Sequence, residues 1–211
     1  MNLPAFLREG GPIMPLIVVT GLVGYALAAE RLIVWLGWLR RDRPLMRALE
    51  PEELQARLRE AVSDTPVTPF AWVLQHAVAA LPLPKARREA AIQARLLACM
   101  PQVGTRIATI GWLGGMLPML GLMGTVSGMI LTFRSLAATS SRQVLSLGLA
   151  EALYATLAGL LGALPLLAAH HVLTRLKARW LLHLERCLTL LEQQAPEEPP
   201  AHPPAGARHE A

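Results

Sequence analysis

The sequence is poor in charged residues, in aromatic side chains and in cysteine. Charged residues make up 17% of its 211 residues and aromatic residues 5%, whereas a soluble domain averages about 25% charged residues. The two cysteines, Cys99 and Cys187, stand alone without the spacing of metal ligands, which favours two reduced thiols. There is no Ser-His-Asp set, Walker loop, zinc-ligand spacing or glycosidase-type pair of acids. The sequence therefore does not support an enzyme active site, a metal site or a cofactor.

The excess of positive charge does not indicate binding to nucleic acid. The net charge is +5, but the arginines flank long apolar runs and are not interleaved with aromatic side chains, as a nucleic-acid surface would be. The first residues, MNLPAFLREGGP, lack the cationic head and the small-residue cleavage site of a secretory signal. We therefore expect the first apolar run to stay in the membrane.

Three long apolar runs are the main feature that is present. They predict transmembrane helices over residues 12–39, 107–133 and 144–173. The uncharged part of the first run, residues 12–29, would cover about 27 Å as a helix, close to the hydrocarbon thickness of a bilayer. The sequence thus predicts an all-α membrane protein with three spans.

Lysine and arginine are unevenly distributed around these runs. They gather in residues 40–106 and directly after residue 173, whereas residues 1–11 and 134–143 contain few. The positive-inside rule then predicts an outer N-terminus, a cytoplasmic region over 40–106, a short outer (periplasmic) turn over 134–143 and a cytoplasmic C-terminus.

The predicted cytoplasmic region has the pattern of short amphipathic helices. Pro51 suits the first position of a helix, and Leu54, Leu58 and Val62 share one face of it. A second short helix is predicted over residues 70–81, after a turn over residues 63–69 and before a break at the prolines near residue 82.

Helix is also expected to continue beyond the second and third runs. From Lys85 the pattern predicts one long helix into the second run, with Pro101 and Gly104 as its weak points. Residues 174–194 extend the third run as helix, so both spans continue into a cytoplasmic helical bundle. Residues 195–211, rich in Pro, Glu and Ala, are predicted to be disordered.

Small residues recur at intervals of about one helical turn in the second and third runs. They include Gly111, Gly115, Gly121, Gly124 and Gly128 in the second run and Gly148, Ala152, Ala155, Gly159 and Gly162 in the third. Small residues one turn apart let helix backbones approach closely in lipid. The runs could pack on each other within one chain. Because two complete stripes exceed what one such contact needs, we favour an additional role in oligomerisation.

Pro118 and Pro165 interrupt the hydrogen bonding of these two runs. Each removes the donor for a carbonyl one turn earlier, at Gly114 and Leu161. This predicts either a kink with a hydrated backbone site or a static structural bend.

Glu151 is the one acidic residue in the third run. It lies roughly 10 Å from the outer end of the predicted helix, where an ionised acid costs a few kcal/mol. The residues leave three roles open: titration in an ion path, pairing with a basic group of a partner, or hydrogen bonding as a neutral structural group.

Polar groups near Glu151 are few. Thr125 and Thr156 lie in the outer-to-middle part of the second and third runs, and hydroxyls in such helices most often bond back to their own backbone. Thr156 is roughly 140° around the helix from Glu151, so the two need not face one cavity. The pair His170-His171 lacks a third ligand and is expected at the inner interface rather than on a metal.

Two of these stretches together resemble the MotA/TolQ/ExbB proton-channel family. Residues 118–133, PMLGLMGTVSGMIxxF, are similar to the second-span signature of the family, and residues 147–165, LGLAEALYATLAGLLGALP, to its third-span signature. Glu30-Arg31-Leu32 and Gly10-Gly11-Pro12 add to the likeness, which is greatest for ExbB-type members. Ala155 stands where the family often has a second threonine.

The resemblance implies an ExbB-like stator subunit rather than an enzyme. It would form a ring of five copies in the bacterial inner membrane, around a single-span partner similar to ExbD or TolR that supplies the titrating Asp. Neither Asp42 nor Asp64 of this chain lies in a predicted span. Proton flow would drive a TonB- or TolA-like protein, with Thr125, Glu151 and Thr156 along the proton path and Pro118 and Pro165 shaping it.

Two other functions stay open at this point. A TolQ-like role would serve envelope integrity instead of TonB-dependent transport. A non-conducting membrane scaffold would use Glu151 and the threonines for packing alone.

Overall fold

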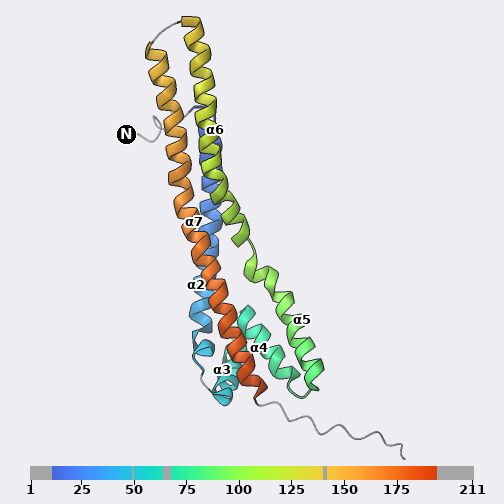
Figure 1. Cartoon of the computed structure of the whole chain (residues 1–211). Coiled ribbons are helices and arrows are strands. Elements are labelled where there is room, and N and C mark those ends of the chain that lie inside the picture. The colour runs from blue at the N-terminus through green and yellow to red at the C-terminus, as the bar shows by residue number, and fades with distance from the viewer. Residues whose placement is uncertain (1–10, 49, 64–67, 140–141, 194–211) are drawn as a thin grey trace, which may run out of the picture. The chain divides into compact units, whose positions relative to one another are not determined.

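The computed structural model describes residues 11–48, 50–63, 68–139 and 142–193, and in these ranges it contains helices and turns but no strand. The helices are α2 (Met14–Met46), α3 (Pro51–Ser63), α4 (Pro69–Ala80), α5 (Lys85–Gly104), α6 (Ile107–Thr139) and α7 (Arg142–Glu192) (Figure 1). Three helical stretches, in α2, α6 and α7, are long and apolar enough to cross a membrane. The prediction of an all-α protein with three membrane-spanning helices is confirmed.

Local sequence signals explain where the short helices begin. Pro51 opens α3, with Glu52 and Glu53 in its first turn, where acidic groups complement the helix dipole. Thr68 is the N-cap of α4, and its hydroxyl accepts a hydrogen bond from the Ala71 backbone N–H at 3.2 Å. Val62 and most of the predicted turn at 63–69 lie outside the residues whose side chains are described.

The predicted long helix from Lys85 into the second run is present but interrupted. Helix α5 ends at Gly104 and α6 begins at Ile107, so the break falls directly after one of the two predicted weak points. Arg106 in this break has a φ of 63°, a left-handed conformation that L-residues with side chains rarely adopt. Its guanidinium forms an ion pair with Glu30 of α2, which ties the break to that helix.

The long helices extend further than the apolar runs. Helix α6 continues to Thr139 and α7 begins at Arg142, so helix occupies most of the segment 134–143 where a turn was predicted. That segment contains neither Gly nor Pro, the two residues least favourable to a helix. Helix α7 continues to Glu192, through nearly all of the predicted extension 174–194, whereas residues 195–211 lie outside the described part.

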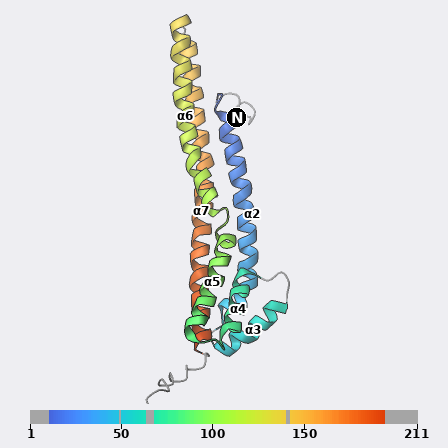
Figure 2. The same ribbon diagram turned by 90° about the vertical axis from the view of Figure 1, so that its right-hand side faces the viewer.

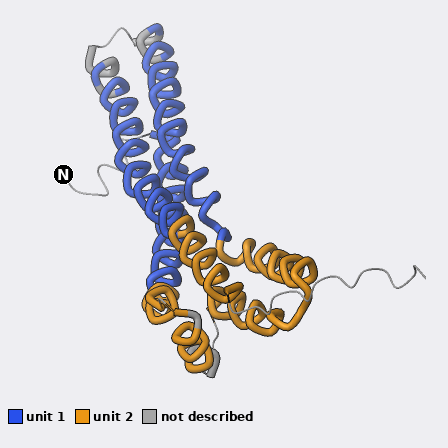
Figure 3. Tube along the Cα trace, turned by 60° about the horizontal axis from the view of Figure 1, so that its bottom comes forward, with its two compact units in different colours: residues 1–36, 104–176 blue, residues 37–103, 177–211 orange. Residues whose placement is uncertain are grey.

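The chain divides into two compact units (Figure 3). Unit 1 comprises Met1–Leu36 and Gly104–Leu176, and it contains α6 with the first parts of α2 and α7. In this unit α6 and α7 run side by side (Figure 2). Helix α2 joins them through Tyr25, whose hydroxyl donates to the Gly162 carbonyl oxygen at 2.8 Å, and through Gly24, which packs on Leu166.

Unit 2 comprises Gly37–Val103 and Lys177–Ala211. Its core forms where α4 meets the last part of α7: the rings of Phe70 and Trp180 pack edge to face with centroids 5.7 Å apart, and both side chains are fully buried. Leu45 at the end of α2 is also buried, and its carbonyl oxygen lies 3.8 Å from the Cys187 sulfur. Apolar contacts among helix ends therefore hold this unit.

Unit 2 also buries one carboxyl group. Asp42 follows the apolar part of α2 and is 1% exposed; one of its oxygens accepts a hydrogen bond from the Thr68 hydroxyl at 2.5 Å, and the other is buried without a hydrogen-bond partner. Burial raises the pKa of Asp42 to about 6, against the opposing effects of the Thr68 hydroxyl and the Arg41 charge. The bond joins the end of α2 to the N-cap of α4.

Candidate functional site

The glycines of α6 and α7 form a seam in which the two backbones touch. A Cβ atom added at Gly159 would lie 2.5 Å from the Leu117 carbonyl oxygen, and one at Gly121 would lie 3.0 Å from the Thr156 Cα. Gly128 meets Ala152 at 3.0 Å. At Gly159 the added atom would meet backbone, so a side chain there would force the two helices apart. At Gly121 and Gly128 the fit is so tight that neighbouring atoms would have to shift by a few tenths of an ångström.

The remaining glycines of the two stripes have contacts within the same chain, with one exception. Gly124 meets Ala155, Gly148 meets Thr132, Gly162 meets Leu117, and Gly111 meets the His170 ring. Only Gly115, among the predicted packing glycines, has no neighbour within 4 Å of an added Cβ. Most of the two stripes is thus occupied by the contact between α6 and α7 within one chain, and the predicted additional role in oligomerisation stays a prediction.

The two predicted pore threonines use their hydroxyls differently. The Thr156 hydroxyl donates across the seam to the Gly121 carbonyl oxygen at 3.1 Å. The Thr125 hydroxyl donates to the Leu122 carbonyl oxygen of its own helix at 2.7 Å, as most such hydroxyls do. Thr156 therefore contributes directly to the α6–α7 contact, whereas Thr125 does not.

Glu151 lies beside the start of α2. Its carboxyl group approaches Gly11 so closely that a Cβ atom at Gly11 would overlap it. Gly11 also has a φ of 71°, a conformation that favours glycine. The positive φ favours glycine at position 11, and a larger residue there would also displace the one acidic side chain of the third run.

Sequence reasoning missed Gly11 as a site residue. The signal was present, because Gly10 and Gly11 directly precede Pro12 at the start of the first run, but only the folded chain brings residue 11 to residue 151. Thr125, Glu151 and Thr156 lie along the same stretch of unit 1, yet their polar groups meet three different partners: Leu122, Gly11 and Gly121. Within one chain they do not form a single cluster.

The two prolines lie at a common level of the seam. Pro118 is inside α6 and Pro165 is inside α7. Gly114, whose carbonyl loses its helical donor to Pro118, packs on Leu166 and Leu167, directly after Pro165. The backbone irregularities of the two helices are therefore brought together.

His170 serves a packing role in unit 1. Its Nδ1 atom is 2.9 Å from the Ile107 carbonyl oxygen, and its ring covers Gly111. In the described residues no group of three His, Cys, Asp or Glu side chains could hold a metal ion.

Large apolar side chains cover the outside of unit 1. Met119 is 72% exposed, Ile33 70% and Leu22 68%. An apolar surface of this extent is typical of a chain that contacts lipid or other membrane helices.

Comparisons with known proteins identify a family for this chain. The family model described as the MotA/TolQ/ExbB proton channel family matches residues 68–186. A protein of Vibrio cholerae named "Biopolymer transport protein exbB1" is 41% identical over 88 residues. That match covers 40% of this chain and only 38% of the length of the relative.

Proposed function

The chain belongs to the MotA/TolQ/ExbB proton channel family and is a multi-pass membrane protein, and from this premise we propose that it is an ExbB-like stator subunit. It couples the proton motive force across the bacterial inner membrane to TonB-dependent transport across the outer membrane. The similarity to the Vibrio cholerae protein named as an ExbB supports this choice within the family.

Glu151 carries the proposal. It is the one acidic residue between residues 107 and 173 and lies in the apolar part of α7, and an ionisable group in such a place is a functional candidate by default. Thr125, on α6, and Thr156, on α7, extend the polar path along the same stretch. Pro118 and Pro165 shape it, because each leaves one backbone carbonyl without a helical donor.

Several copies are needed to complete the path. The polar groups of Thr125, Glu151 and Thr156 meet different partners in one chain, so a continuous proton path needs surfaces from neighbouring copies and from a pore partner. We propose a pentamer that encloses a single-span, ExbD- or TolR-like protein bearing the titrating Asp, and that acts on a TonB- or TolA-like protein. The exposed apolar side chains of unit 1 suit both lipid and these contacts.

The proposed orientation follows from the distribution of basic residues. Arg40, Arg41 and Arg43 follow the first span, and Arg175, Lys177 and Arg179 follow the third. The positive-inside rule then puts the N-terminus in the periplasm and the C-terminus in the cytoplasm. Unit 2 becomes the cytoplasmic helical bundle.

The test replaces Glu151 by Ala and by Gln in cells that depend on TonB-linked uptake. Both variants should lose energy-dependent uptake, because neither side chain can release a proton, while native mass spectrometry still finds the assembled ring. Glu185→Ala, an exposed acid farther along α7, is the matched control and should transport normally. Normal uptake by Glu151→Gln would reject the proton-path role.

Two further measurements separate the alternative functions. A deletion that causes iron or cobalamin starvation supports the ExbB-like role, whereas detergent sensitivity supports a TolQ-like one. Proton flux into vesicles that contain the chain and its pore partner distinguishes a channel from a non-conducting scaffold, which would pass no protons.

A further inference from the structure

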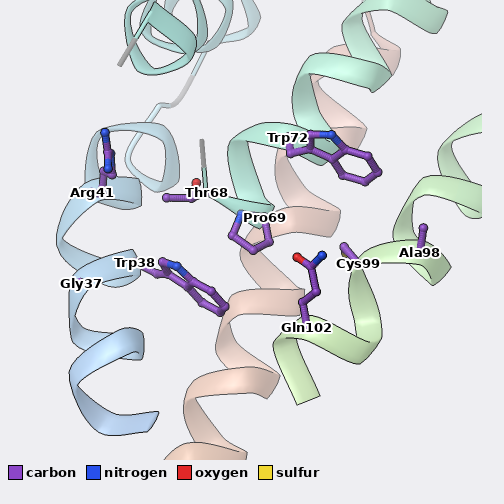
Figure 4. A pocket seen from close by; sticks show the side chains of 9 residues that line it. All are labelled: Gly37, Trp38, Arg41, Thr68, Pro69, Trp72, Ala98, Cys99 and Gln102. Carbon is purple, nitrogen blue, oxygen red and sulfur yellow. The ribbon is translucent and has the colours of Figure 1, made fainter. Parts of the chain in front are cut away.

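Unit 2 contains a cavity of about 560 Å³ that the proton path does not use. It lies between the part of α2 after residue 36, the start of α4 and the end of α5, and its walls include Trp38, Arg41, Pro69, Trp72, Cys99 and Gln102 (Figure 4). The volume is in the range of pockets that bind small molecules or peptide segments.

The walls of this cavity combine aromatic rings, an amide and positive charge. In Figure 4 Pro69 lies between the indoles of Trp38 and Trp72, and Gln102 faces them from α5. Arg41 is the one charged residue among the nine that line the cavity. A second positive charge is close, because the Arg95 guanidinium carbon lies 5.6 Å from the centre of the Trp72 ring.

Aromatic-lined grooves of this kind bind proline-rich segments. Such segments adopt the polyproline II conformation at little entropic cost, and their rings pack on tryptophan. The chain itself carries such a segment in residues 196–204, PEEPPAHPP, which repeats the spacing Pro-x-x-Pro. The segment also carries Glu197 and Glu198, whose charge is opposite to that of Arg41 and Arg95.

The segment is long enough to reach the cavity. Trp180 of α7 packs on Phe70, the neighbour of Pro69 in the cavity wall, and from Trp180 to Gln193 the chain advances about 20 Å as helix. A polyproline II chain advances about 3.1 Å per residue, so seven residues in that conformation would cover roughly 20 Å, enough to return to that level. Pro203 and Pro204 extend the reach further.

We propose that residues 196–204 dock in the tryptophan-lined cavity of unit 2 of the same chain, with their prolines on the indoles and their glutamates toward Arg41 and Arg95. Docking ties the chain beyond α7 to α2 and α4. This inference does not depend on the proposed proton path, since every residue it uses lies outside unit 1.

The test uses the full chain in lipid nanodiscs, labelled with 5-fluorotryptophan and observed by fluorine NMR. Single Trp→Phe variants assign the five tryptophan signals. Two altered chains are compared with the native one: a chain that ends at Gln193, and a full-length chain with alanine at the five prolines of the segment. Both should shift the Trp38 and Trp72 signals and leave that of Trp112, in unit 1, unchanged.

A synthetic peptide of residues 194–211 tests the charge contacts. It should restore the two signals when added to the shortened chain. A peptide with Glu197→Gln and Glu198→Gln should bind roughly 2- to 30-fold more weakly, as expected for two surface ion pairs, whereas a Glu210→Gln peptide, altered outside the segment, should bind as the native one does.

Two outcomes would overturn the proposal. Unchanged Trp38 and Trp72 signals in the shortened chain would show that the segment does not occupy the cavity. Full restoration of these signals when the labelled shortened chain is assembled with an equal amount of unlabelled full-length chain would show that the segment comes from another copy, because a segment held in its own cavity is not available to a neighbour.

Discussion

The seam between α6 and α7 makes a sharp prediction about two glycines. Gly159→Ala should destabilise the chain, whereas Gly115→Ala, on the facing helix, should not. An added Cβ at Gly159 would lie 2.5 Å from the Leu117 carbonyl oxygen and 3.1 Å from the Gly121 Cα. These are backbone atoms, which cannot rotate away, so the helices themselves must separate. At Gly115 the added atom meets nothing within 4 Å.

The magnitudes follow from two opposing terms. Overpacking a well-packed contact costs about 1 to 3 kcal/mol, and replacing glycine by alanine inside a helix stabilises it by about 0.5 to 1 kcal/mol. At the middle of both ranges, Gly159→Ala should therefore lose about 1 kcal/mol net. For a chain of this size that lowers the Tm by roughly 2 to 4 °C. Gly115→Ala retains only the helix-propensity gain and should unfold at the native temperature or slightly above it.

The assay is thermal unfolding of the purified chain in detergent, followed by circular dichroism, with assembly measured separately by native mass spectrometry. The reasoning fails if Gly159→Ala unfolds at or above the native temperature. Loss of assembly in Gly115→Ala, with unchanged unfolding, would identify Gly115 as a contact between copies.

Two further predictions concern Gly11 and Asp42. Gly11→Ala should abolish energy-dependent uptake in an assembled ring, because the added methyl group displaces the Glu151 carboxyl; Gly37→Ala, which meets nothing within 4 Å, is the control, and normal uptake by Gly11→Ala would contradict the contact. The pKa of Asp42 is raised from 3.8 to about 6 in the folded chain. The protonated carboxyl therefore stabilises the folded chain fully below about pH 4. This contribution to the free energy of unfolding, up to about 3 kcal/mol, is lost as the pH rises through 6. Asp42→Asn should remove this part of the pH dependence of unfolding, and an unchanged pH profile would argue against a buried, titrating Asp42.

Local sequence was sufficient for the helices and for most of their ends. Long uncharged runs must satisfy their backbone polar groups within the segment, so their composition alone required helix at the three predicted spans. Pro51, and Thr68 followed by Pro69, mark helix starts through interactions within one turn. Such signals can be recognised in the sequence without knowledge of the tertiary structure, because all the groups involved are near neighbours in the chain.

The break between α5 and α6 could be predicted only in part from the sequence. Gly104 marked a weak point, but helix propensity alone allowed the helix to continue. The ion pair of Arg106 with Glu30, 76 residues earlier, accompanies the left-handed backbone at that position. A contact at that separation depends on how the helices pack, which helix propensity does not contain.

The partners of the small and acidic residues were decided by the tertiary structure. The glycine stripes predicted close helix contact, but the spacing of the small residues is the same for a contact within a chain and for one between chains. Only the packing of α6 on α7 shows that Gly121, Gly128 and Gly159 contact residues of the same chain. In the same way the sequence identified Glu151 as a lone acid in an apolar run. Its contact with Gly11, 140 residues away in the chain, depends on the packing of the start of α2 against α7 and could not be predicted from sequence.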